Sequence, residues 1–236
     1  MKTSNKILLG SFLTALLILV SVHVALYAKY KRGDYTLVTD SMWPMDITTT
    51  HLIKDVKYIS LNNIENIEVR ASDTSMLRYE KPKENEENIL SVTQNGDTLF
   101  VLGKSQKNEI GRWYRRTELL LAGEMPVFVT NAALHVRHGE RDQPLSLNLK
   151  IDKTFLELEG REEGKGNYGL IKIDAVNESR IELRNIKTNN LQIGLNKSSI
   201  EDHNLLADSI SISTDAASEI KLKGQNLVKA KFTTHE

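Results

Sequence analysis

The chain has 236 residues, and its 31 Lys and Arg residues balance its 31 Asp and Glu residues, so net charge gives no argument for nucleic-acid binding. The absence of cysteine excludes disulfides, cysteine-ligated zinc, thiol catalysis and N-terminal lipidation of the bacterial lipoprotein type. Hydrophobic residues make up 40% of the sequence, enough for a core once one apolar N-terminal segment is set aside.

The first element in the chain is that apolar segment, residues 7–28, which follows a short tail, residues 1–6. It contains no Asp, Glu, Lys or Arg, and as a helix it spans about 33 Å, enough to cross a bilayer. The run is longer than the apolar part of a signal peptide and ends without a small-x-small cleavage site. We therefore expect one uncleaved transmembrane anchor. Lysines on both sides leave its orientation open, and we expect no intramembrane function of His23.

Residues 29–52 carry charges, Gly33, Pro44 and a run of threonines without a sustained period, which predicts a juxtamembrane linker. From residue 53 the apolar residues alternate with polar ones, the period of β-strands. Asn95-Gly96 lies between two such runs and is the preferred signal for a type I′ hairpin. We expect an antiparallel strand region at the N-terminal end of one folded domain, residues 53–236.

The second half of the chain repeats with a period of about 20 residues. Two alternating apolar pairs return in step, and the second pair follows a serine at Ser179, Ser198 and Ser218. The first pairs are Ile171 with Ile173, Leu191 with Ile193, and Ile210 with Ile212; the second positions are Ile181 with Leu183, Ile200, and Ile220 with Leu222. This period is typical of a parallel β-solenoid, in which each coil gives one strand to each of two facing sheets.

The pattern extends upstream less regularly. Val127 and Val129 begin one coil and Leu145 and Leu147 begin the next, and Leu134 and Leu156 mark their second strands. A Gly-rich insertion, residues 160–169, then lengthens the step to the first regular coil. At the C-terminal end, the residues expected inward are Val228, Ala230 and Phe232, and those expected outward are Lys229 and Lys231. Outward charge protects an edge strand from further pairing.

The outward positions contain no convincing chemistry, so we expect no catalytic, cofactor-binding or metal site and no enzyme activity. Glu182 and Glu201 form a candidate carboxylate pair in neighbouring coils, but charges facing solvent are ordinary there. A weak calcium site at Glu157, Glu159, Glu162 and Glu163 lacks a supporting loop motif, and His135 and His138 have the wrong spacing for one face of a strand. The serine row Ser211 and Ser213 is interpreted as the small outer face of a sheet.

One cluster stays open between two interpretations. Residues 113–116, Trp-Tyr-Arg-Arg, either form a binding patch or hold an aromatic docked at a sheet edge. No Walker loop, dinucleotide-binding fingerprint, Gly-x-Ser-x-Gly motif or triad is present.

The serial motifs beginning at Ser179, Asn190 and Ser218 resemble the auto-transporter adhesin head domain, or GIN domain, of Bacteroidetes envelopes, over about residues 53–232. The matching stretches are Ser-Arg-Ile-Glu-Leu, Asn-Leu-Gln-Ile-Gly-Leu and Ser-Glu-Ile-Lys-Leu-Lys-Gly. The resemblance implies a right-handed coil and a domain on the periplasmic side of the inner membrane.

We therefore expect an all-β, right-handed parallel β-solenoid with a single-pass anchor, acting as a non-enzymatic binding, adhesion-like or scaffold module. Its partners would be the membrane, through residues 7–28, and a protein or glycan ligand, without nucleic acid. Two alternatives remain: a carbohydrate-active β-helix enzyme, whose site would need two converging carboxyl groups, and an accessory subunit of an envelope transporter or sensor.

Overall fold

The computed structural model describes residues 48–80, 90–103, 117–137, 144–160 and 167–235, and nine residues between Phe12 and Tyr27. The chain forms two compact units, Met1–Met45 and Asp46–Glu236. The nine residues of the first unit are helical, and the Ser21 hydroxyl donates to the Leu17 carbonyl oxygen at 2.8 Å. Within the described residues, no helix has the length and apolar character needed to cross a membrane. Much of the expected anchor lies outside those residues, so the anchor stays a prediction.

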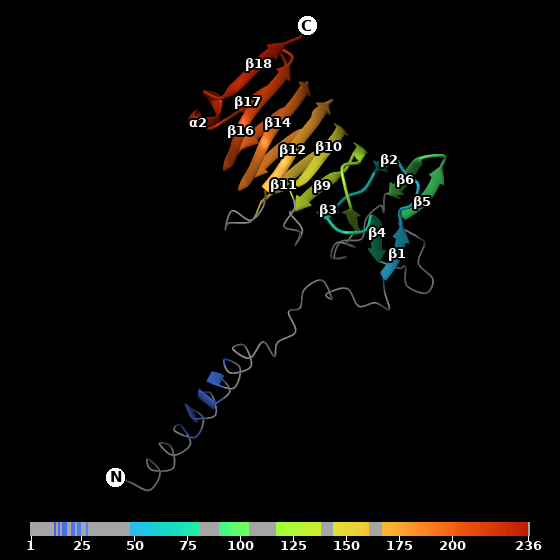
Figure 1. Ribbon diagram of the computed structural model, residues 1–236, viewed down its shortest axis with the longest axis vertical. Coiled ribbons are helices and arrows are strands. Elements are labelled where there is room, and N and C mark those ends of the chain that lie inside the picture. Colours follow the sequence, from blue (N-terminus) through green and yellow to red (C-terminus); the bar gives the residue numbers. More distant parts are fainter. Residues whose placement is uncertain are drawn as a thin grey trace. The chain divides into compact units, whose positions relative to one another are not determined.

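The second unit is built almost entirely from strands in two nine-stranded sheets, counted over the described residues (Figure 1). The first, sheet A, has the order β1 (Thr48–Leu52), β4 (Met76–Glu80), β7 (Thr117–Leu121), β3 (Ile67–Ala71), β9 (Ala133–Arg137), β11 (Phe155–Glu159), β13 (Arg180–Arg184), β15 (Ser199–Asp202) and β17 (Glu219–Lys221). The second, sheet B, has the order β5 (Leu90–Asn95), β6 (Thr98–Gly103), β2 (Tyr58–Asn62), β8 (Pro126–Thr130), β10 (Leu145–Asp152), β12 (Asn167–Val176), β14 (Ile186–Asn196), β16 (Leu205–Thr214) and β18 (Ala230–Thr234).

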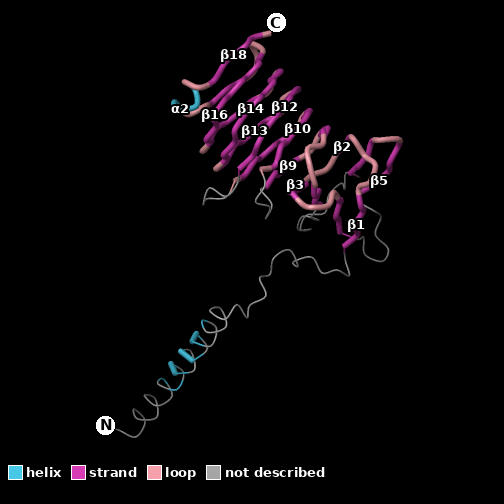
Figure 2. Tube along the Cα trace, viewed as in Figure 1, coloured by secondary structure: helices cyan, strands magenta, loops and turns pink. Residues whose placement is uncertain are grey.

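From β8 onward the chain passes from a strand of sheet B to a strand of sheet A and back, and each strand pairs in parallel with its equivalent in the next coil (Figure 2). The predicted first pairs are confirmed, because Ile171 is the Cα partner of Leu191, and Leu191 of Ile210. The predicted second positions also pair, in sheet A, where Ile181 is the Cα partner of Ile200. These side chains are almost fully buried in one continuous core, so the predicted β-solenoid is confirmed. Its handedness stays a prediction.

The upstream register differs from the prediction in sheet B. Val127 pairs with Leu149 rather than with Leu145, so the step between these two coils is longer than predicted. In sheet A, Leu134 pairs with Leu156 as predicted. The difference arises because β10 alternates over eight residues, and periodicity alone does not show which pair along a long strand meets its neighbour.

The N-terminal region contains antiparallel pairs, as predicted, and it also contains parallel pairs, which were not predicted. β2 and β3 are parallel to β8 and β9, and β6 and β7 form a further parallel rung on their other side. Only the pairs of β1 with β4, β4 with β7, and β5 with β6 are antiparallel among the described strands. β1 also occupies the last five residues of the predicted linker. The stack therefore begins earlier than expected, under an antiparallel cap.

The hairpin predicted at Asn95-Gly96 is confirmed between β5 and β6, but its turn type is different. Asn95 pairs with Thr98, so the loop residues are Gly96 and Asp97. A type I′ turn needs a positive φ at both loop residues, whereas only Gly96 has one, at 59°. That pattern matches a type II′ turn, which places glycine first.

The corners between the two sheets explain the recurring serine. Ser179 is buried, and its hydroxyl donates to the Val176 carbonyl at 2.7 Å while it accepts from the Thr154 amide at 3.2 Å. Ser198 is buried in the same way on the next coil, and its hydroxyl donates to the Asn196 carbonyl at 2.9 Å. Buried backbone groups need such partners wherever strand pairing stops. The serines therefore mark corners and are not part of a surface site.

The C-terminal end differs in part from the prediction. Phe232 is the Cα partner of the buried Ile212, as its inward position requires, yet 43% of it is exposed since no described strand covers it. Val228 is not in a strand; it follows the short helix α2 (Gly224–Leu227) and is 89% exposed. α2 places Asn226 in the core, where its amide donates to Asp202 at 2.7 Å.

Candidate functional site

The outer faces of the two sheets carry different kinds of side chain. In both, every second residue points into the shared core, and the residues between them point out. Outward residues in neighbouring parallel strands lie about 4.8 Å apart, so each forms a row with its equivalents along the stack. The rows of sheet A are charged, whereas those of sheet B contain small polar, aromatic and lysine residues.

A central row of acidic residues follows the outer face of sheet A. Its successive Cα partners are Glu118, Glu68, His135, Glu157, Glu182, Glu201 and Lys221. Carboxylates at this spacing repel one another unless cations lie between them. Arginines in the flanking rows supply these cations.

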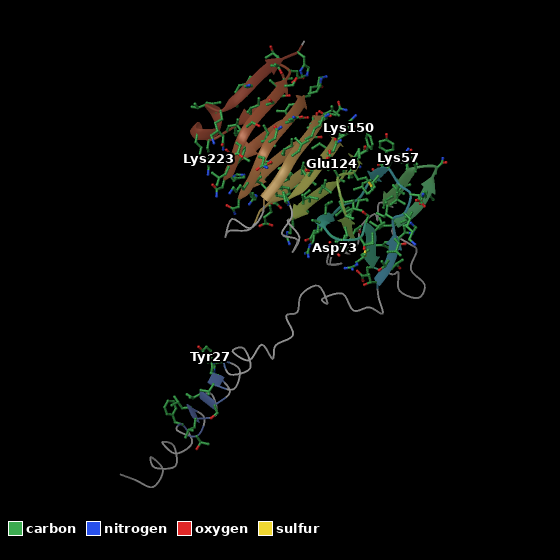
Figure 3. All side chains as sticks on the ribbon, in the orientation of Figure 1. Tyr27, Lys57, Asp73, Glu124, Lys150 and Lys223 are labelled. Carbon is green, nitrogen blue, oxygen red and sulfur yellow. The ribbon has the colours of Figure 1, made fainter. Side chains whose placement is uncertain are left out.

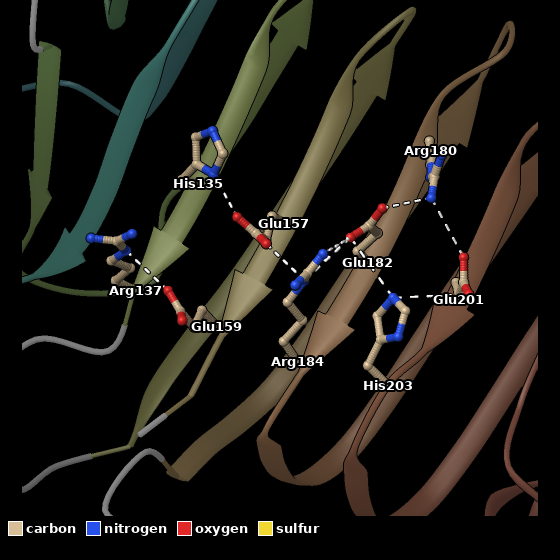
Figure 4. A network of polar contacts seen from close by, with 9 residues as sticks. All are labelled: His135, Arg137, Glu157, Glu159, Arg180, Glu182, Arg184, Glu201 and His203. Carbon is tan, nitrogen blue, oxygen red and sulfur yellow. Dashed lines mark hydrogen bonds and ion pairs between the residues drawn. The ribbon is translucent and has the colours of Figure 1, made fainter. Parts of the chain in front are cut away.

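Glu182, in the middle of this row, is held between two arginines (Figure 4). One of its oxygens, Oε2, accepts from Arg184 Nη2 at 2.6 Å, and the other, Oε1, lies 2.7 Å from Arg180 Nη2. Arg184 Nε also reaches Glu157 Oε1 at 2.8 Å and thereby joins two rungs. The arginines cover Glu182, which is only 4% exposed although it points outward. The hydrogen bond from Arg184 holds the pKa of Glu182 below its ordinary value, although burial acts in the opposite direction.

The same pairing continues toward the N-terminal end of sheet A. His135 Nδ1 lies 2.8 Å from Glu157 Oε2, and Arg137 Nε lies 3.1 Å from Glu159 (Figure 4). Further along, Arg70 is 2.6 Å from Glu68 and 3.5 Å from Glu118. We call these residues the charge ladder: Glu118, Arg70, Glu68, Arg137, Glu159, His135, Glu157, Arg184, Glu182, Arg180, Glu201 and His203.

The carboxylate pair considered from the sequence, Glu182 and Glu201, is brought together, since the two are Cα partners. Arg180 lies between them, at 2.7 Å from Glu182 and 3.5 Å from Glu201. Glycoside hydrolysis needs one carboxyl that keeps a proton to give to the leaving group, whereas the arginines beside Glu182 lower its pKa and favour its ionised form. The nearby hollow, lined by Glu201 and Glu219 with Arg180 and Lys221, has a volume of about 120 Å³. This is below the usual size of a ligand pocket, roughly 300 Å³ or more.

The weaker metal hypotheses find no support among the described residues. Glu157 and Glu159 are engaged by Arg184 and Arg137, and His135 contacts a carboxylate. No group of three or more His, Asp or Glu residues in the described ranges has a metal-binding arrangement. Glu162, Glu163 and His138 lie outside the described residues, as do residues 113–116 of the aromatic and arginine cluster.

Sheet B has a groove on its outer face, across β12, β14, β16 and β18. Its volume is about 380 Å³, within the range of ligand pockets. Its lining comprises Lys172, Asp174, Gln192, Ile193, Gly194, Ser211, Ile212, Ser213, Lys231 and Thr233. The hollow forms because Gly194, Ser211 and Ser213 are short while the lysines beside them are long. A Cβ on Gly194 would lie 2.9 Å from Asp174 Oδ1, so glycine lets this carboxylate lean over the floor. The serine row interpreted as a plain outer face thus lines a hollow of ligand size.

An aromatic patch continues the same face toward the N-terminal end. Tyr58, Phe100 and Leu102 are 40%, 42% and 44% exposed, and the Tyr58 ring lies 6.1 Å from that of Phe128. Lys150 places its ammonium 5.5 Å from the Phe128 ring centroid, a cation–π contact. Figure 3 labels Lys150 on the ribbon of the second unit. Sequence reasoning missed this patch, although Phe100 and Phe128 each stand in the outward position between two inward aliphatic residues.

No family model matches the chain, and no curated protein matches it. Solved structures with a similar arrangement include a candidate lipid-binding protein from Parabacteroides distasonis, with 14% identity and a TM-score of 0.41 over 73% of this chain and 80% of that one. A candidate adhesin from Bacteroides fragilis has 14% identity and a TM-score of 0.39, over 80% and 94% of the two chains. A candidate cell adhesion protein from Clostridium sporogenes has 14% identity and a TM-score of 0.33, over 75% and 99%. Membership of the GIN family stays a prediction.

Proposed function

We propose that the chain is a membrane-anchored, non-enzymatic binding module that displays its β-solenoid on the periplasmic side of the inner membrane. The observation that carries the binding role is the groove on sheet B. Its lining lies on strands that are hydrogen-bonded to neighbours, and not on loops. A site on such rigid elements is formed before the ligand arrives, so binding costs little ordering of the protein.

The charges of the two outer faces support a role without catalysis. The groove is lined by a single carboxylate, Asp174, where hydrolysis of a glycosidic bond would use two. On sheet A the carboxylates of the charge ladder are plentiful, but arginines pair with them. A carboxylate that is held ionised by an arginine is a poor general acid.

The anchor and its orientation rest on the sequence. Residues 7–28 are uncharged over a length that spans a bilayer, and the described residues within them are helical. The periplasmic side is what the resemblance to GIN domains implies. Protease added to intact spheroplasts should therefore digest the solenoid domain of the full chain. Protection of the domain until the membrane is lysed would contradict the proposed location.

One experiment on the full chain in detergent distinguishes a binding protein from an enzyme. An array of polysaccharides and phospholipids is probed with the wild-type chain and with Ser211→Tyr, whose ring would fill the groove without entering the core. We expect at least one ligand to be held by the wild type, lost by this variant and recovered with its mass unchanged.

The matched control is Ser199→Tyr, which fills the small hollow of sheet A and should bind like the wild type. Loss of binding in this control alone would move the site to sheet A. Shortened ligand in the wild-type sample would establish an enzyme instead.

A further inference from the structure

We propose that the ligand of the sheet B face is an acidic polysaccharide, lying along the stack from the aromatic patch to the groove. This inference rests on the proposed binding function and names its ligand class. The aromatic patch would stack on sugar rings, and three lysines, Lys150, Lys172 and Lys231, would bind the carboxylates of the chain.

The spacing of the aromatic side chains fits a carbohydrate. Phe100 and Phe128 flank Ser60 in one row, since each is its Cα partner. Two strand spacings place the Cα atoms of Phe100 and Phe128 about 10 Å apart, close to the length of a disaccharide unit. Ser60 is short, so it leaves a sugar resting on the rings free to approach the sheet. Aromatic faces attract the C–H groups of a pyranose ring in the way that they attract other positively polarised edges.

The patch and the groove belong to one continuous row. From Phe128 the successive Cα partners are Lys150, Asp174, Gly194, Ser213 and Thr233. The row therefore runs from the rings over Lys150 directly onto the floor of the groove. From Phe100 to Ser213 there are six strand spacings, about 29 Å. This length would hold about six sugar residues, at half of the disaccharide length each.

The charge of this face favours an acidic chain. Lys150, Lys172 and Lys231 form no ion pair with any described residue, unlike the cations of the charge ladder. Against these lysines, the row and the groove contain one carboxylate, Asp174. The surface thus keeps an excess of positive charge, with Lys150 in the row of the rings and Lys172 and Lys231 in the neighbouring outward row. An extended polymer with regularly spaced carboxylates is complementary to it.

The inference is tested by affinity electrophoresis of the full chain in detergent. The gels contain polygalacturonate, polymannuronate or hyaluronan, and parallel gels contain the methyl esters, which keep the backbone and remove the charge. We expect binding to at least one acidic polymer, at least tenfold weaker binding to its ester, and weakening by added salt. Phe100→Ala and Lys150→Ala should each reduce the affinity about tenfold.

Two controls match these variants on other surfaces. Leu52→Ala removes an apolar side chain of similar exposure from β1 at the edge of sheet A, 51% against 42% for Phe100. Lys221→Ala removes an exposed lysine of sheet A. Both should bind like the wild type, and circular dichroism should show that all four variants are folded.

Binding to none of the three acidic polymers, equal binding to an ester, or equal losses in the controls would overturn the inference. If a different ligand on the array is held and is lost in Ser211→Tyr, the binding function stands and only the ligand class falls. If no ligand is sensitive to Ser211→Tyr, the proposed function falls as well.

Discussion

The two outer faces share one backbone plan but differ in what their outward rows do. On sheet A, acidic residues recur along the stack and are interleaved with arginines, so that even an outward carboxylate such as Glu182 is almost completely covered. On sheet B, short residues recur beside lysines that have no ion pair among the described residues, and a groove and an aromatic patch result. In a stack every outward side chain meets its equivalents at the same spacing, so one residue type repeated along a row decides the character of a whole face. We infer that sheet A supports stability and sheet B is the face available to a ligand.

The largest expected effect compares the inner and outer sides of one strand. Ile212 is 1% exposed, and Ile212→Asp would place a carboxylate in the core without a partner. We expect a loss of about 4 kcal/mol or more in the free energy of unfolding, enough to unfold the C-terminal coils. Ser211→Asp, on the outer side, should change it by about 0.5 kcal/mol or less. Urea denaturation followed by circular dichroism measures both, and equal effects would contradict the solenoid register.

A smaller effect tests whether the charge ladder stabilises the fold. Glu182→Gln keeps the shape of the side chain but removes the charge between Arg180 and Arg184. We expect a loss of about 1 to 2 kcal/mol, limited because both arginines are about half exposed. Glu201→Gln is the matched change in the next coil, where the contacts with Arg180 and His203 are 3.5 Å and 3.9 Å, and it should cost less than about 0.5 kcal/mol.

The pH dependence of the same variant gives an independent measurement. Because the pKa of Glu182 is lowered in the folded chain, its contribution is fully present above the ordinary carboxyl pKa and is lost as the pH falls through the lower folded value. The difference in stability between wild type and Glu182→Gln should therefore be present at neutral pH and should shrink in acid. A difference that does not change with pH would mean that the loss comes from packing and not from charge.

Much of the fold could be predicted from local patterns. The alternation at Ile171, Leu191 and Ile210 specified inward rows, and their constant spacing specified stacking in parallel register, because a repeat of this kind buries its apolar face only against its own neighbours. The predicted register is wrong at Val127, because the longer strand β10 can align with β8 in several equivalent ways. The parallel pairing of β2 with β6 was also missed, since strands so far apart in the chain leave no local sign of their contact.

The candidate site, like the fold, has features that the sequence predicts and others that only the structure shows. From the sequence alone follow the all-β class, the repeat, the inward residues and the absence of cysteine chemistry, since each depends on residue identity and spacing along the chain. Only the tertiary structure decided that Arg184 joins Glu157 to Glu182, that Ser211 and Ser213 line a groove, and that Phe100, Phe128 and Lys150 share one face. Those relations depend on which coils are neighbours, and neighbours are set by the packing of distant strands around the common core.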